Sequence, residues 1–155
     1  QHEKIGYNYR LSNVCAGIGR GQMEVLEEHV AHHKRVHQLY QKAFESVDGI
    51  SLQVNPNHEF DSNFWLSTIL IDESKTGVNY ETLRVELDKK NIETRPLWKP
   101  LHLQPVFSSV PAYVDGTSER LFHQGLCLPS GPCVTDEDVQ YVVDSIMECL
   151  SVSYK

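Results

Sequence analysis

Apolar and polar positions follow a helical period at both ends of the chain. Residues 12–47 contain no proline and carry apolar side chains at helical spacing, which predicts one long helix or two joined helices. Ser12 is expected to cap the first turn, and Gly49 is expected to stop the helix. A second helix is predicted after a cap at Thr135, with acidic residues in its first turn. Its apolar stripe comprises Val139, Val142, Val143, Ile146, Met147 and Leu150.

The region between these helices consists of short runs that are rich in β-branched and aromatic residues. Strands are predicted at residues 50–54, 63–71, 92–95 and 125–128. A short helix capped by Asn79 and a helical turn at 118–124 are also predicted. Residues 96–111 contain four prolines and are predicted to form a loop. This order of elements predicts an α/β (α+β) two-layer sandwich, with a long N-terminal helix and a small, mostly antiparallel sheet.

The composition indicates a single globular domain over residues 1–155. A chain of 155 residues, 40% of them hydrophobic, is long enough to bury one core. It carries 14 Lys and Arg against 21 Asp and Glu, a net charge of -7, which argues against a nucleic-acid partner or a polybasic membrane surface. No apolar run approaches the roughly 20 residues that span a bilayer, so we expect a cytoplasmic protein. Because the chain starts at Gln1 without methionine, we expect a piece of a longer protein.

Three features invite a ligand interpretation, and a structural interpretation is favoured for each. The four cysteines show no C-x-x-C spacing, so we expect reduced thiols and no metal site. His29, His33 and His37 share one side of the predicted helix, where they would either bind a metal or, as their charged neighbours favour, form a hydrated face. The glycines at 17, 19 and 21 lack the preceding strand and the spacing of a phosphate-binding loop, so we expect close helix packing there.

Two polar segments carry the candidate chemistry. Residues 6–12 read G-Y-N-Y-R-L-S, and the amide of Asn8 and the guanidinium of Arg10 could hold a phosphate. A chain entry with stacked tyrosines and an exposed arginine would explain the same pattern. Residues 95–105 place cations, an aromatic residue and His102 in a rigid loop, which suits an anionic ligand with a flat or sugar ring. The residues alone leave both interpretations open.

Together these segments resemble the C-terminal part of the DegT/DnrJ/EryC1/StrS family of pyridoxal-phosphate-dependent sugar aminotransferases. Residues 6–12, followed by a long helix, are similar to the family's G-x-N-Y-R-[LM]-[ST] block. Residues 94–105 are similar to its loop around a histidine and a Q-P pair. The run L-C-L-P-S-G at 126–131, followed by a threonine-capped helix, is similar to its closing segment. The resemblance covers nearly the whole chain.

The resemblance implies the small C-terminal domain of a fold-type-I aminotransferase that forms a homodimer, with active sites at the subunit interface. Residues 1–20 would then be the end of the large-domain and interface region. Asn8 is expected to reach the cofactor phosphate of the partner subunit, and Arg10 and His102 are expected to hold the nucleotide-sugar substrate. Weaker candidates in the same loop are Arg95, Trp98 and Lys99.

One part of the family pattern is missing. In the family, the lysine that forms the Schiff base with pyridoxal phosphate lies upstream of the N-Y-R block, and Lys4 does not match its position. We therefore expect no catalytic residue in this chain. The implied activity of the longer protein is transfer of an amino group from an amino acid, glutamate being the expected donor, to a keto sugar nucleotide in cell-surface polysaccharide synthesis. The alternatives are a pyridoxal-phosphate-dependent sugar dehydratase and a non-catalytic sugar-nucleotide-binding or regulatory module.

Overall fold

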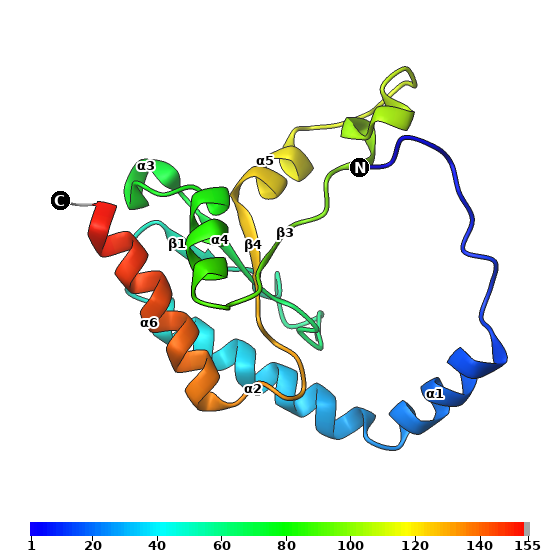
Figure 1. The fold of residues 1–155 in the computed structure, drawn as a ribbon, viewed down its shortest axis with the longest axis horizontal. Coiled ribbons are helices and arrows are strands. Elements are labelled where there is room, and N and C mark those ends of the chain that lie inside the picture. Colours follow the sequence, from blue (N-terminus) through cyan, green and yellow to red (C-terminus); the bar gives the residue numbers. More distant parts are fainter. Residues whose placement is uncertain (154–155) are drawn as a thin grey trace.

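The computed structural model describes residues 1–153 and has a four-stranded sheet at its centre (Figure 1). The strands are β1 (Ile50–Leu52), β2 (Ser67–Ile71), β3 (Arg95–Pro96) and β4 (Gly125–Leu128), in the order β1-β2-β4-β3. All three pairings are antiparallel. The small antiparallel sheet predicted from the sequence is therefore confirmed.

The register of the sheet sorts its side chains onto two faces, because successive residues of a strand point to opposite sides. Ile69 lies opposite Leu126, and both side chains are fully buried in the core. Thr68 lies opposite Cys127, so these two side chains belong to the other face. The core face is completed by helical side chains, among them Val36, Tyr40, Phe44, Leu83, Leu87, Val142 and Ile146.

Three helices supply these side chains: α2 (Leu26–Phe44), α4 (Tyr80–Lys89) and α6 (Asp136–Ser153) (Figure 1). Asn79 caps α4, since its side-chain oxygen accepts a hydrogen bond from the backbone N–H of Thr82 at 2.9 Å. Before α6, the N–H of Thr135 donates to the Asp138 carboxylate at 2.9 Å, and the N–H of Asp138 donates to the Thr135 hydroxyl at 3.1 Å. The two-layer arrangement and both caps match the predictions.

The predicted helix over residues 12–47 consists of two helices, α1 (Asn13–Met23) and α2. The Ser12 hydroxyl accepts a hydrogen bond from the N–H of Cys15 at 3.2 Å, which confirms the predicted cap. The prediction that Gly49 stops the helix is wrong, because α2 already ends at Phe44. Gly49 instead forms a later turn with a φ of 85°, and a Cβ atom there would lie 2.7 Å from Cγ2 of Thr76.

Three predicted strands are shorter or displaced. β2 begins at Ser67, later than predicted, because Phe64 has a φ of 47°, which a strand residue cannot adopt. β1 ends early, and β3 lies at Arg95–Pro96 instead of 92–95. β4 has its predicted bounds. The predicted apolar stripe of the last helix is wrong at Met147, because this residue is 40% exposed.

The remaining elements are short. The proline-rich loop contains two 3-10 turns, η1 (Leu101–Leu103) and η2 (Pro105–Phe107), and is otherwise irregular as predicted. α5 (Thr117–Gln124) matches the predicted helical turn, and α3 (Glu73–Thr76) was not predicted. Within residues 1–153, no helix is long and apolar enough to cross a membrane.

Candidate functional site

The N-terminal segment, residues 1–11, has no regular secondary structure and is anchored to the proline-rich loop by its first residues. The backbone N–H of His2 donates to Oε1 of Gln104 at 3.0 Å, and the N–H of Val106 donates to the carbonyl oxygen of His2 at 3.1 Å. From this anchor the segment runs away from the sheet toward α1 (Figure 1). The fold therefore places the start of this segment beside the candidate loop, although 102 positions separate His2 from Gln104.

Asn8 and Arg10 lie in the exposed part of this segment, beyond the anchor at His2. Tyr9 and Arg10 have φ values of 57° and 78°. This left-handed conformation costs roughly 1–2 kcal/mol per non-glycine residue, and such strain concentrates at functional sites. Within residues 1–153, no hydrogen bond or ion pair engages the side chains of Asn8 and Arg10. The rings of Tyr7 and Tyr9 are tilted at 59° rather than stacked, and the side chain of Arg10 is exposed, as it would also be in a simple chain entry.

α1 presents an apolar surface that the rest of the chain leaves uncovered. None of its residues is buried, and a Cβ atom built on Gly17, Gly19 or Gly21 would meet nothing within 4 Å. No element of the described chain packs on these glycines, so their close packing on a neighbour stays a prediction. The exposed apolar residues of the N-terminal segment and α1 are Ile5, Tyr7, Tyr9, Leu11, Val14, Ile18 and Met23.

His102 lies in η1 and is paired with Glu119. Its Nε2 atom is 2.7 Å from Oε1 of Glu119, and the two side chains are 17% and 40% exposed. Glu119 stands in the first turn of α5, where a negative charge also suits the positive end of the helix. The sequence prediction missed Glu119, because a spacing of 17 residues across an irregular region carries no signal for such a pair.

Gln104 is a buried polar residue between the loop and the N-terminal segment, and it is 6% exposed. Its Oε1 accepts from His2, and its Nε2 donates to the carbonyl oxygen of Lys99 at 3.2 Å. An unpaired buried amide would cost about 1–3 kcal/mol, so these two hydrogen bonds determine where the side chain lies. Gln104 thereby holds the loop that carries His102 against the start of the N-terminal segment.

The structure brings the three predicted site residues together only in part. His102 and the start of the N-terminal segment share the neighbourhood of Gln104. No hydrogen bond or ion pair joins Asn8 or Arg10 to His102 in the part of the chain that the structure describes. The ligand roles of Asn8, Arg10 and His102 stay predictions.

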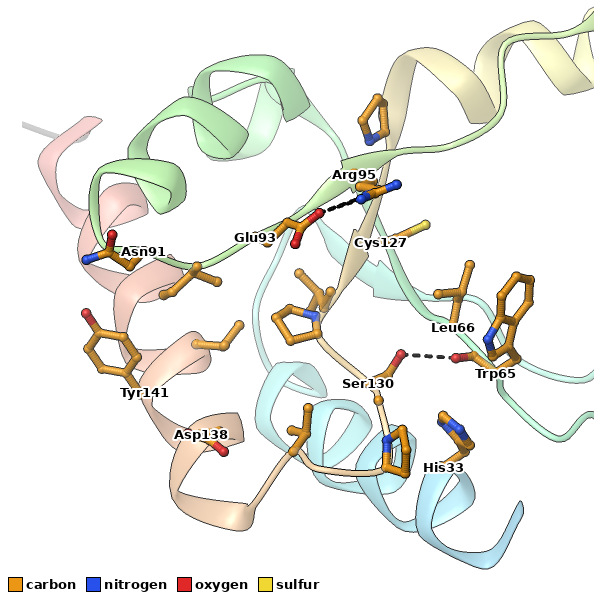
Figure 2. Close-up of a pocket in the computed structure, with 18 of the residues that line it drawn as sticks. His33, Trp65, Leu66, Asn91, Glu93, Arg95, Cys127, Ser130, Asp138 and Tyr141 are labelled. Carbon is orange, nitrogen blue, oxygen red and sulfur yellow. Dashed lines mark hydrogen bonds and ion pairs between the residues drawn. The ribbon is translucent and has the colours of Figure 1, made fainter. Parts of the chain in front are cut away.

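A groove of about 900 Å³ lies near the β3 edge of the sheet (Figure 2). Two weaker candidates, Arg95 and Trp98, line it together with Trp65, which precedes β2. The Arg95 guanidinium donates to Oε1 of Glu93 at 3.0 and 2.6 Å, so it is engaged within the chain. Trp65 and Trp98 are 63% and 68% exposed. His102 is not part of the groove lining, so the groove and the His102–Glu119 pair are separate features.

The histidines of α2 do not form the hydrated face that the sequence favoured. His37 is 2% exposed, and its ring stacks on Phe64 with centroids 3.8 Å apart. Neither ring nitrogen of His37 has a hydrogen-bond partner among the described residues. Burial lowers the pKa of His37, and burial also lowers the pKa of His33. The charged residues around His37 in the sequence did not indicate that the loop carrying Phe64 covers this side of α2.

The free energy of unfolding is expected to fall as the pH drops below 6.5, the ordinary pKa of histidine. Because the pKa of His37 is lowered in the folded chain, the unfolded chain binds more protons there. This contribution to stability is present above 6.5 and is lost as the pH falls toward the folded pKa. His37→Phe keeps a ring against Phe64 and should weaken the pH dependence, measured by urea unfolding. The same weakening in the exposed control His58→Phe would contradict the assignment to His37.

Known proteins share both the sequence pattern and the fold of this chain. Residues 1–147 match the DegT/DnrJ/EryC1/StrS aminotransferase family, and the chain belongs to this family. EpsN of Bacillus subtilis (strain 168), which is named as a pyridoxal phosphate-dependent aminotransferase, is 38% identical over 152 residues, covering 95% of this chain and 38% of EpsN. The GDP-perosamine synthase of Escherichia coli O157:H7 is 33% identical over 150 residues, covering 97% of this chain and 39% of the synthase. The chain therefore spans about two fifths of the length of these relatives.

Solved structures show the same fold. DesV of S. venezuelae superposes with a TM-score of 0.77 at 25% identity, covering 97% of this chain and 39% of DesV. DesI, solved in the presence of its TDP-sugar product, superposes with a TM-score of 0.79 at 22% identity, covering 91% of this chain and 36% of DesI. The predicted family and fold class are confirmed.

Pyridoxal phosphate is the cofactor of this family, so the donor groups of this chain can be compared with what the cofactor needs. A phosphate monoester is held by N–H donors and by positive charge. Asn8 offers an amide NH₂ and Arg10 a guanidinium, and both are exposed and unengaged in the described chain. These donors fit the phosphate end of the cofactor.

Proposed function

We propose that this chain is the C-terminal part of a longer enzyme that transfers an amino group from an amino acid, with glutamate as donor, to a keto sugar nucleotide. We place this enzyme in the cytoplasm, in the synthesis of cell-surface polysaccharide. Its relatives support the substrate class: besides GDP-perosamine synthase, they include SpsC of Bacillus subtilis, named as a spore coat polysaccharide biosynthesis protein. The observation that carries the proposal is the strained, exposed stretch from Asn8 to Arg10, whose segment is anchored beside the His102 loop.

Each predicted site residue meets a different part of the ligands in this proposal. The amide of Asn8 donates to the cofactor phosphate. The guanidinium of Arg10 pairs with the diphosphate of the nucleotide sugar, because its planar donors match phosphate oxygens. His102 contacts the sugar. Pyridoxal phosphate, when bound, supplies the electron sink for the amino-group chemistry. Local donors of this kind are needed because a chain with a net charge of -7 does not attract anions as a whole.

In our proposal, the lysine that forms the Schiff base with pyridoxal phosphate lies in the part of the enzyme outside this chain. The only lysine before Asn8 is Lys4, an exposed residue at a position that does not match the family's lysine. The chain accordingly positions ligands but supplies no nucleophile, and its isolated form is expected to be inactive.

The proposal includes a homodimer in which Asn8 of one protomer reaches the cofactor of its partner. The uncovered apolar side chains of the N-terminal segment and α1 support this assembly, because exposed apolar residues that gather on neighbouring elements are typical of protein interfaces. The open space beside Gly17, Gly19 and Gly21 leaves room for the backbone of another element. In such an assembly the stretch from Asn8 to Arg10 would lie between two subunits.

Two substitutions in the full-length enzyme test this function. Arg10→Ala is expected to raise the KM for the nucleotide sugar by about 10- to 100-fold, because one charge-assisted contact to phosphate contributes roughly 1.5–3 kcal/mol. Asn8→Ala is expected to weaken cofactor binding about tenfold for the same reason. Steady-state kinetics measure the first change, and titration of the apoenzyme with pyridoxal phosphate measures the second.

Arg84→Ala is the matched control, because Arg84 lies on α4 and pairs with the neighbouring Glu81 at 2.7 Å. It should leave both quantities unchanged. If the Arg10→Ala and Arg84→Ala enzymes have the same KM for the nucleotide sugar, Arg10 does not bind the substrate. If Asn8→Ala binds pyridoxal phosphate with full affinity, Asn8 does not bind the cofactor.

A further inference from the structure

The contact between His102 and Glu119 joins two segments that lie outside the sheet pairings. His102 belongs to η1 and Glu119 to α5, and the Nε2–Oε1 distance is 2.7 Å. The imidazole is mostly buried, with 17% of the side chain exposed, so it has few other positions to adopt. An ionised carboxylate can only accept hydrogen bonds, which makes Nε2 of His102 the donor.

The two segments are held in place on both sides of this contact. Leu97 lies against Gly125, where a Cβ atom would come within 2.1 Å of Cδ1 of Leu97. On the other side of His102, Gln104 donates to the carbonyl oxygen of Lys99 within the same loop. The loop that carries His102 is therefore fixed against β4 at Leu97 and braced internally at Gln104.

The start of α5 is also ordered locally. A carboxylate oxygen of Asp115 accepts a hydrogen bond from the N–H of Thr117 at 2.9 Å. Glu119 follows within the first helical turn. Because Glu119 stands on a helix whose start is defined, its carboxylate is presented to His102 from a rigid element.

We propose that Glu119 is a positioning residue that fixes His102 as the Nε2–H tautomer and leaves Nδ1 as the ring nitrogen that accepts a hydrogen bond from a sugar hydroxyl of the substrate. The tautomer of a neutral histidine is set by the hydrogen bond of the other ring nitrogen. With Nε2 committed to Glu119, the ring offers an acceptor rather than a donor to the ligand. This inference rests on the proposed role of His102 in sugar binding.

A purely structural role explains the pair less well. Glu119 is 40% exposed, so water can replace His102 as the hydrogen-bond partner of its carboxylate. The contact therefore adds little to folding, whereas it decides which ring nitrogen faces a ligand. Loss of the Glu119 contact should therefore change the tautomer of His102 and leave the melting temperature nearly unchanged.

Nitrogen-15 NMR of the histidine rings in the full chain tests the inference directly. At a pH where the ring is neutral, His102 should show a pyrrole-type shift for Nε2 and a pyridine-type shift for Nδ1, assigned by comparison with His102→Gln. Glu119→Gln has the same shape but an amide that both donates and accepts, so it should produce a mixture of tautomers. Glu119→Asp, which keeps the acceptor-only group, should restore the single tautomer. A single Nε2–H tautomer in Glu119→Gln would overturn the inference.

Glu137→Gln is the matched control, because Glu137 also stands exposed in the first turn of a helix, α6. It should leave the His102 signals unchanged. A tautomer change in this variant as large as that in Glu119→Gln would count against a specific role for Glu119.

Kinetics of the full-length enzyme separate this inference from the proposed function. Glu119→Gln should raise the KM for the nucleotide sugar about tenfold, the equivalent of one misdirected hydrogen bond, and leave the KM for the amino-acid donor unchanged. If His102→Ala leaves the KM for the nucleotide sugar unchanged, while His102 of the unsubstituted enzyme shows a single tautomer by NMR, the proposed role of His102 in sugar binding fails. If His102→Ala raises the sugar KM but Glu119→Gln does not, the positioning role fails instead.

Discussion

Truncation of Tyr40 to alanine is expected to lower the free energy of unfolding by about 4 kcal/mol, measured by urea denaturation. Tyr40 has no exposed surface and lies at the centre of the core, with its ring 6.4 Å from that of Phe44. Its hydroxyl donates to the carbonyl oxygen of Pro129 at 2.9 Å, which links α2 to the loop after β4. Removal of the ring therefore leaves a cavity and also takes away the hydrogen-bond donor of a partly buried carbonyl.

Tyr40→Phe separates these two contributions, because it keeps the ring and removes only the hydroxyl. We expect a loss of about 1 kcal/mol for this variant. Tyr141→Phe is the matched control: the hydroxyl of Tyr141 donates to the carbonyl oxygen of Lys90 at 3.2 Å, but the residue is 53% exposed. Water replaces that hydrogen bond, so the control should lose less. Equal losses would show that the contact with Pro129 is not a buried hydrogen bond.

Gly125→Ala is the second substitution with a large expected effect, a loss of about 2 kcal/mol in the free energy of unfolding. The backbone at Gly125 is extended, with φ of -94° and ψ of 138°, so the conformation itself admits any residue. The added Cβ atom, however, would lie 2.1 Å from Cδ1 of Leu97 and 2.7 Å from the carbonyl oxygen of Leu121. Either the Leu97 loop or the end of α5 must move.

Gly131→Ala is the control for this prediction, because a Cβ atom on Gly131 meets nothing within 4 Å. It should change the free energy of unfolding by less than about 0.5 kcal/mol. The two variants compared by urea denaturation isolate the steric effect. Since Leu97 precedes η1, Gly125→Ala should also disturb the His102–Glu119 contact and change the nitrogen-15 NMR signals of His102. Unchanged signals would show that the added Cβ atom displaces only the side chain of Leu97.

The features that the sequence predicted well are those whose physical cause is local. Ser12, Asn79 and Thr135 cap their helices because each hydroxyl or amide reaches a backbone N–H only three residues away. The last helix follows from the period of its apolar residues, and the strand at 125–128 is a short run that is buried throughout. The family resemblance likewise rests on short blocks of residues, and it is confirmed.

The features that the sequence missed depend on contacts between distant segments. His37 was assigned to a hydrated face, yet Phe64 covers it from a loop that lies 27 positions later. Glu119 had no assigned role, because its partner His102 meets it only once the loop has packed on α5.

By itself the sequence determined the family, the two-layer architecture and the identity of the candidate ligand donors Asn8, Arg10 and His102, since periodicity, caps and motif blocks are all short-range information. Only the tertiary structure decided the surroundings of these donors. It anchored His2 on Gln104, gave Tyr9 and Arg10 positive φ values and set His102 against Glu119. The physical reason is that burial and hydrogen-bond partners belong to pairs of residues brought together by packing, and no single segment contains both members of such a pair.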